Sequence, residues 1–201
     1  MKIQSKTFAE GEMIPERCAF GRMGEKGETV ASENRLPELS WTEVPEGTKS
    51  FVLCCLDDDV PTDLKARDQS GEIPAHQPRR RFVHWVQADV SPAVRSLPEG
   101  ALAHGAPVPR EFGRPGVNDY SRGEIPPEGG VGTGYDGPCP PFFDARRHYY
   151  RFQVVALDTA RLGELPKHFT WADVDQAMKG HVLATAELVG GYTLNPRLRG
   201  A

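Results

Sequence analysis

Three long runs of apolar, aromatic and β-branched residues constrain the fold of this chain more than any other feature. Residues 51–56, "FVLCCL", are continuously apolar, which is typical of a strand buried on both faces. Residues 81–90 are mostly apolar, and residues 148–158 alternate and are rich in aromatic and β-branched residues, which is the pattern of β-strands. The sequence therefore predicts a mainly β protein built around these strands.

Composition favours the same class. The chain of 201 residues contains 21 glycines and 18 prolines without a repeat or a polar tract, which indicates many tight turns and not disorder. A chain of this length can bury a core without disulfides, so we expect a single domain over residues 1–201. The four cysteines lack a CxxC spacing and are expected to be reduced and mainly buried.

The remaining elements follow from turn signals and periodicity. Residues 62–81 are charged and turn-forming, which predicts a long surface excursion. Glycine and proline recur every few residues over 91–141, and such a stretch usually borders a functional site. Thr170 is the expected N-cap of one helix with an apolar stripe at Val174, Ala177 and Met178. Residues 187–194 are expected to form a last strand, although 181–194 also fit a continued helix.

Charge and hydropathy exclude several classes of partner. The formal net charge of −4 provides no general attraction for nucleic acid or an anionic membrane, so nucleic acid is not an expected partner. No N-terminal basic and apolar segment resembles a signal peptide, and no apolar run approaches the ~20 residues that span a bilayer. We therefore expect a cytoplasmic protein without a transmembrane segment.

Polar side chains stand at the ends or edges of the three strongest strands. Asp57 and Asp59 follow the first strand, His84 lies in the second, and His148 and Tyr150 open the third. If these strands are neighbours in a sheet, the side chains can converge on one cavity. However, a histidine in an apolar strand is more often a structural residue than a ligand, and three successive aspartates are usually a solvated turn. The residues alone leave both interpretations open.

Other kinds of site have weaker support. The sequence lacks HxH, HExxH and Cys/His spacings, so no metal is expected. It also lacks GxSxG, and Cys139 lies between prolines with no activating histidine nearby in the sequence. The glycine-rich stretch "GGVGTG" at 129–134 is followed by neither Lys-Ser/Thr nor a helix pattern, so it is interpreted as a turning loop and not a phosphate loop.

Six stretches taken together identify a family. The segments "LDDDVPTD", "FVHWVQADV", "GVNDY", "GYDGPCPP", "HYYRFQVVALD" and "AMKGHVLATAELVGGYTL" resemble, in order and spacing, the phosphatidylethanolamine-binding protein family, which includes Raf kinase inhibitor protein and plant flowering regulators. The bacterial and archaeal branch is the most similar, and the resemblance extends from about residue 51 to 198. It implies a large antiparallel central sheet with a smaller sheet and few peripheral helices.

The resemblance also implies a small pocket for phosphate, phosphorylethanolamine, acetate or similar anions. By motif it assigns ligand binding to nine residues: Asp57, Asp59, Pro61, His84, Tyr120, Gly137, Pro138, His148 and Tyr150. Two motifs depart from the common pattern. H-R-Y is His148-Tyr149-Tyr150 here, and D-P-D-x-P has Asp58 in place of the proline.

We expect His84 and His148 to donate into the pocket, held in the right tautomer by a carboxylate of the D-x-D-x-P motif. A backbone N–H near Gly137 and the Tyr150 hydroxyl would complete a cage for an oxyanion. Binding would then strengthen as the pH falls through the pKa of the histidines, ordinarily about 6.5.

The expected function is that of a non-catalytic binding or regulatory protein without cofactors, similar to a kinase-inhibitor-like modulator. Two alternatives stay open: a hydrolase or other enzyme that uses the His/Asp/Tyr pocket, and an inhibitor of a kinase or protease that acts through its surface. A small anionic ligand is the expected partner, and the sequence leaves a protein partner and a homodimer open.

Overall fold

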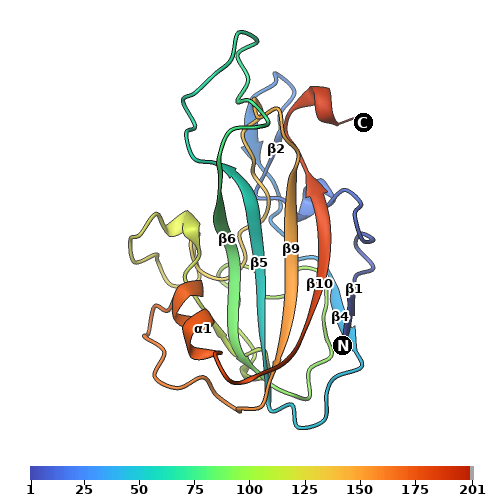
Figure 1. Cartoon of the computed structure of the whole chain (residues 1–201), viewed down its shortest axis with the longest axis vertical. Helices are drawn as coiled ribbons and strands as arrows, with labels where there is room; N and C mark the ends of the chain where they lie inside the picture. Colours follow the sequence, from blue (N-terminus) through green and yellow to red (C-terminus); the bar gives the residue numbers. More distant parts are fainter. Residues whose placement is uncertain (200–201) are drawn as a thin grey trace.

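The computed structural model describes residues 1–199, and its centre is a five-stranded antiparallel sheet whose long strands lie along the long axis of the molecule (Figure 1). The strand order is β10-β9-β5-β6-β8. These strands are β5 (Ser50–Pro61), β6 (Arg79–Val90), β8 (Arg114–Pro115), β9 (His148–Leu157) and β10 (Val182–Tyr192). The three predicted strands are therefore confirmed, and they are adjacent in the order β9-β5-β6.

Two smaller sheets and the core lie against this central sheet. One has the order β1-β4-β7, from β1 (Lys2–Gln4), β4 (Leu39–Thr42) and β7 (Ser96–Leu97), and the other pairs β2 (Gly21–Met23) with β3 (Thr29–Ala31). Alternate residues of β5 belong to different apolar clusters, with Phe51 and Leu53 in one and Val52 in another. Burial on both faces explains why 51–56 is continuously apolar.

The single α-helix among residues 1–199 is α1 (Trp171–Ala177), which packs beside β6 (Figure 1). Thr170 is its N-cap, as predicted, and its N–H and hydroxyl both donate to the Asp173 carboxylate at 2.8 Å. Val174 and Met178 are buried and fix the helix to the second cluster. Short 3-10 helices are η1 (Glu16–Cys18), η2 (Arg110–Phe112), η3 (Asp119–Ser121) and η4 (Pro196–Leu198).

Two local predictions need correction. The aspartates Asp57–Asp59 lie inside β5 and not after it, because β5 keeps pairing with β6 as far as Pro61↔Arg79, through an irregular register between Asp57 and Val60. The segment that fitted either helix or strand is a strand from Val182. The short strands before residue 50 were not predicted, because three or four residues are too few to show a period.

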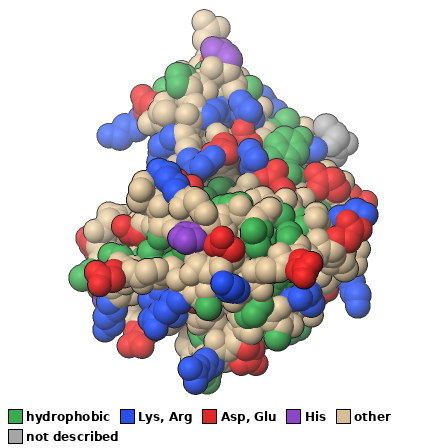
Figure 2. Space-filling model, turned by 60° about the horizontal axis from the view of Figure 1, so that its bottom comes forward, with side chains coloured by type: hydrophobic (Ala, Val, Ile, Leu, Met, Phe, Trp, Pro, Cys, Tyr) green, Lys and Arg blue, Asp and Glu red, His purple; other side chains and the backbone are tan. Residues whose placement is uncertain are grey.

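The predicted fold class is confirmed: a mainly β protein with a large antiparallel sheet, smaller sheets and few helices. No helix within residues 1–199 has the length and apolar character required to cross a membrane. On the face seen in Figure 2, acidic and basic side chains are interspersed. This face therefore offers no extended basic surface of the kind that binds nucleic acid.

Candidate functional site

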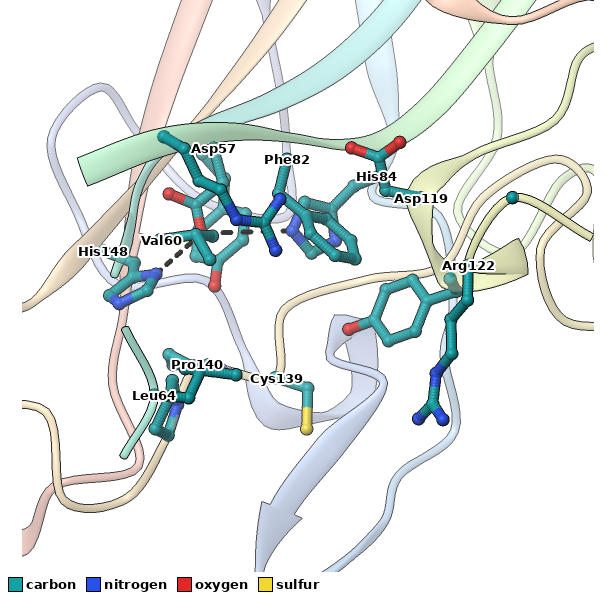
Figure 3. A pocket seen from close by; sticks show the side chains of 15 residues that line it. Asp57, Val60, Leu64, Phe82, His84, Asp119, Arg122, Cys139, Pro140 and His148 are labelled. Carbon is teal, nitrogen blue, oxygen red and sulfur yellow. Dashed lines mark hydrogen bonds and ion pairs between the residues drawn. The ribbon is translucent and has the colours of Figure 1, made fainter. Parts of the chain in front are cut away.

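A cavity of about 660 Å³ lies at the end of the central sheet where β5 ends and β6 and β9 begin (Figure 3). The register of the sheet aligns residues of three strands at this end, because Asp57 of β5 pairs with Phe82 of β6 on one side and with Tyr150 of β9 on the other. Five of the nine predicted ligand-binding residues line the cavity: Asp57, Tyr120, His84, His148 and Tyr150. The expected convergence of the three strands on one cavity is thus present.

Four of these residues form what we call the floor of the cavity: Asp57, His84, His148 and Tyr150. They are at most 3% exposed. Asp57 is at the centre, and its Oδ1 accepts the backbone N–H of Asp59 at 2.7 Å. Its Oδ2 lies 2.7 Å from Nδ1 of His148 and 4.0 Å from Nε2 of His84 (Figure 3). One carboxylate therefore faces both imidazoles.

His148 uses both of its ring nitrogens within the protein. Its Nε2 lies 3.0 Å from Oδ2 of Asp144, and Arg79 holds the same carboxylate with two hydrogen bonds of 2.6 and 3.1 Å. Burial opposes the charged ring, but the hydrogen bonds to Asp144 and Asp57 outweigh burial and raise the pKa of His148 to about 9. The expectation that His148 donates into the cavity is therefore wrong, because each N–H is already taken by a carboxylate.

His84 has one ring nitrogen available. Its Nδ1 lies 2.7 Å from the carbonyl oxygen of Asp136 and 3.1 Å from that of Gly137, so this nitrogen carries the proton and donates. The opposite nitrogen, Nε2, is left on the side of Asp57. Burial lowers the pKa of His84 below its ordinary value. The neutral ring therefore presents an acceptor lone pair, which becomes a donor only on protonation.

The two tyrosines of the cavity differ in how their hydroxyls are satisfied. Tyr120 donates to the Gly137 carbonyl oxygen at 3.1 Å. The Tyr150 hydroxyl is buried and has no hydrogen-bond partner among residues 1–199. Burial raises the pKa of both phenols well above the ordinary value, so both stay protonated. A buried hydroxyl without a partner costs free energy, which a polar ligand would recover.

The other four predicted ligand-binding residues, Asp59, Pro61, Gly137 and Pro138, do not line the cavity. Asp59 accepts the N–H of Tyr149 at 2.9 Å and pairs with Arg146 at 2.8 Å. The Gly137 N–H donates to Oδ1 of Asn34 at 2.8 Å, so the expectation that it faces an anion is wrong. A Cβ at Gly137 would lie 2.2 Å from the Cys18 carbonyl oxygen, which shows that close packing requires this glycine.

The structure also explains the two departures from the family motifs. Asp58 is partly exposed and pairs with Arg81 at 2.6 Å, away from the cavity. Tyr149, in place of arginine, is 42% exposed, and Arg146 supplies the guanidinium that holds Asp59. The arginine that contacts Asp59 therefore comes from position 146, two residues before β9 begins.

Sequence reasoning missed a buried carboxylate behind His84. Asp136 is fully buried and accepts hydrogen bonds from Asn118 and the Gly132 N–H, both at 2.8 Å, and from Asn34 at 3.2 Å. His104 lies 3.3 Å from its other oxygen. Because the Asp136 carbonyl holds Nδ1 of His84, these contacts position the imidazole. Asp136 lies in the segment "GYDGPCPP", but the motif assigned ligand binding only to Gly137 and Pro138.

Residues outside the predicted ligand-binding set also line the cavity. Apolar side chains form the walls of the cavity, among them Val60, Leu64, Phe82, Pro140 and Pro141. Three charged and exposed residues form what we call the rim: Arg80, Asp119 and Arg122. Within residues 1–199, no group of three or more His, Cys, Asp or Glu side chains is arranged to hold a metal ion.

Comparison with known proteins agrees with the fold. A profile of the family described as phosphatidylethanolamine-binding protein matches residues 4–193. The chain belongs to the phosphatidylethanolamine-binding protein family. Within this family, a UPF0098 protein of Aquifex aeolicus is 33% identical over 193 residues, spanning 96% of this chain and 88% of the relative. The UPF0098 protein YbhB of Escherichia coli is 31% identical over 209 residues, spanning 96% of this chain and all of the relative.

Solved structures of family members share the fold. The crystal structure of the phosphatidylethanolamine-binding protein homologue CT736 from Chlamydia trachomatis is similar with a TM-score of 0.66 and 30% identity, and the match covers 95% of each chain. That of E. coli YbcL, described as a member of the mammalian phosphatidylethanolamine-binding protein family, gives a TM-score of 0.70 at 27% identity, covering 96% of this chain and 97% of YbcL.

Proposed function

We propose that the protein is a non-catalytic binding protein whose cavity holds a small oxyanion, such as phosphate or the phosphoryl or carboxylate group of a larger molecule. The observation that carries the proposal is the Tyr150 hydroxyl, which is buried at the cavity and has no hydrogen-bond partner in the described part of the chain. An oxyanion offers the acceptor that this donor lacks. Membership of a family named for binding a phospholipid agrees with a binding role.

The second group that favours an oxyanion is Nε2 of His84. In the neutral ring it accepts a hydrogen bond from a protonated phosphate oxygen, and in the charged ring it donates one. Tyr150 and His84 are adjacent, with ring centroids 5.0 Å apart, so one small anion can meet both groups. In this proposal Tyr150 and His84 touch the ligand, while Asp57 and His148 orient them.

The states of Cys139 and His148 at the cavity favour binding over covalent chemistry. Cys139 lines the cavity, and burial raises the pKa of its thiol, so the reactive thiolate is disfavoured. His148 is held between two carboxylates and has no free nitrogen with which to move a proton to a substrate. The alternative enzyme would therefore have to use His84 or a lining carboxylate, Asp57 or Asp119, as its general base or acid.

Calorimetry with inorganic phosphate tests the proposal on the whole chain. Tyr150→Phe and His84→Gln are each expected to weaken phosphate binding roughly tenfold, because each removes one hydrogen bond to a charged group. Tyr135→Phe is the matched control, since its hydroxyl donates to the Cys18 carbonyl at 2.8 Å in the core. Phosphate affinity that is unchanged in both pocket variants would contradict the proposal. Turnover of phenyl phosphate that vanishes in His84→Gln would favour the enzyme instead.

A further inference from the structure

The rim of the cavity carries two arginines that have no carboxylate partner within residues 1–199. The neighbouring Arg79 and Arg81 are both paired with aspartates, at 2.6 Å in each case. Arg80, between them, makes only a 3.5 Å contact with the Arg81 carbonyl and lies 5.8 Å from the Phe82 ring centroid. Arg122 forms no side-chain hydrogen bond or ion pair with the described part of the chain. Both guanidiniums are thus available to a ligand.

The backbone places Arg122 at the rim at a conformational cost. It caps η3 in the left-handed conformation, with φ of 56°, which costs a residue other than glycine roughly 1–2 kcal/mol. The glycine that favours this conformation comes one residue later, at Gly123. The sequence therefore keeps a long cationic side chain at a position where glycine or asparagine is the usual choice.

Between the floor and the rim the cavity is apolar and aromatic. The rings of Phe82 and Tyr120 meet edge to face with centroids 5.1 Å apart, and Pro140 and Leu64 add apolar surface. A volume of about 660 Å³ lies in the range of about 300–1,000 Å³ that accepts small organic molecules. A single phosphate would leave most of this space, including the aromatic surface, without contacts.

The charges of the floor cancel. Within the floor, the charged His148 is paired with Asp57. Arg79 and Asp144, which lie behind the floor, form a second pair of opposite charges. The floor therefore contributes hydrogen-bonding groups without net positive charge. Net positive charge at the cavity comes from the rim, which has two arginines, Arg80 and Arg122, and one carboxylate, Asp119. That carboxylate already accepts the Val83 N–H at 2.8 Å. A ligand with two anionic groups would use both regions.

We propose that the ligand of this cavity is a small molecule with two anionic groups on an aromatic spacer. Its phosphoryl group meets Tyr150 and His84, its spacer contacts Phe82 and Tyr120, and its second anionic group pairs with Arg80 and Arg122. The inference rests on the proposed function, because it takes the floor as the phosphoryl site.

Calorimetry with three probes distinguishes the contributions of the floor, the aromatic surface and the rim to binding. The probes are inorganic phosphate, phenyl phosphate and 4-carboxyphenyl phosphate. For the unaltered protein, the carboxylate is expected to improve binding over phenyl phosphate roughly five- to tenfold, which is the scale of two partly exposed ion pairs. Raising the salt concentration should shrink this gain. The gain is expected to disappear in the double variant Arg80→Gln/Arg122→Gln, which removes only exposed side chains.

Arg110→Gln is the matched control, since Arg110 is exposed, has no carboxylate partner within residues 1–199, and does not line the cavity. It should keep the full gain. Equal affinity of the two aryl probes, or a gain that persists in the double variant, would overturn the inference. Phosphate binding that is lost in Tyr150→Phe would in that case still support the proposed function. A phosphotyrosyl peptide that binds more tightly than 4-carboxyphenyl phosphate would overturn the small-molecule assignment.

Discussion

His148 and Asp57 lie 2.7 Å apart, Nδ1 to Oδ2, on adjacent strands at the floor of the cavity, and each is at most 1% exposed. Asp144 holds the opposite nitrogen of the same ring. A buried imidazole between two carboxylates is stable only as the charged form, because neither carboxylate can donate to it. This pair therefore acts mainly as part of the framework that presents His84 and Tyr150.

The first prediction concerns stability and pH. Because the folded-state pKa of His148 is about 9, above its ordinary value of about 6.5, its stabilisation is complete below pH 6.5 and is lost as the pH rises through 9. The free energy of unfolding should fall over this window by about 3 kcal/mol from this residue. Urea unfolding at several pH values measures the loss, and His181→Gln, at an exposed pair with Asp158, should leave it unchanged. An NMR titration in which His148 deprotonates below pH 7 would refute the prediction.

The second prediction concerns the buried carboxylate that links Arg79 to His148. Asp144→Asn should lower the free energy of unfolding by roughly 3–5 kcal/mol, because it leaves the Arg79 charge buried without its partner. Asp58→Asn breaks the exposed pair with Arg81 at the same 2.6 Å distance and should cost less than about 1 kcal/mol. Denaturant unfolding compares the two variants. Equal losses would show that burial does not decide the strength of these pairs.

The third prediction concerns the pH dependence of anion binding. Burial lowers the pKa of His84 in the free protein, and an anion at Nε2 favours protonation, so binding takes up a proton. The affinity for sulfate, whose charge is constant here, should rise as the pH falls from 7.5 to 5.5, by up to about tenfold per unit. His148 stays charged throughout this range. Calorimetry in buffers of different ionisation enthalpy detects the proton taken up on binding. A His84→Gln variant whose sulfate affinity has the same pH dependence would rule out His84 as the group that takes up the proton.

The fourth prediction concerns Asn34, which adopts a left-handed conformation with φ of 54°. Its side chain accepts the Gly137 N–H and donates to Asp136 and to the Tyr135 carbonyl. Asn34→Gly keeps the backbone conformation but removes these bonds, and should lower the free energy of unfolding by about 2–3 kcal/mol. Its anion affinity should also fall, because the carbonyls that hold His84 lose their support.

Glu43→Gly is the control for this effect of glycine. Glu43 has the same φ of 54°, but its side chain makes an exposed pair with Lys2 and no other ion pair with residues 1–199, so the replacement should change the stability by less than about 1 kcal/mol. Matching losses in the two variants would mean that the Asn34 side chain does not secure the loop.

How much of the structure could be predicted from the sequence depends on how far apart in the sequence the interacting residues are. The strands β5, β6 and β9 were predicted because burial on one or both faces leaves a pattern along ten or so residues. The histidines and Asp57 were placed at one cavity by family resemblance, since the strand order cannot be deduced from the residues. The pairing of both His148 ring nitrogens with carboxylates was not predictable, because it depends on the path of the chain at Asp144, four residues before His148, and on Arg79, which starts β6.

Other differences have the same origin. Gly137 belongs to the motif, yet the motif does not reveal that this glycine packs closely against Cys18 and supports His84. The carbonyl of Pro138 accepts the N–H groups of Phe20 and Gly21. Arg80 and Arg122 carry no local signal, because a charged residue in a loop or at a strand start is usually solvated. Their place at the rim follows only from the folded path of the chain.

The loop between β5 and β6 is attached at Ile73 to the segment that precedes β9: Ile73 is fully buried, its N–H donates to the Phe143 carbonyl at 2.8 Å, and its carbonyl accepts the Ala145 N–H at 3.0 Å. A protease that cuts the exposed tip at 66–71 should consequently yield two fragments that stay associated, and gel filtration after limited digestion would show one species. Insertions in the exposed part of the loop before Ile73 should be tolerated. A change in chain length between Ile73 and Arg79 would instead strain the ion pair of Arg79 with Asp144, which holds the His148 ring.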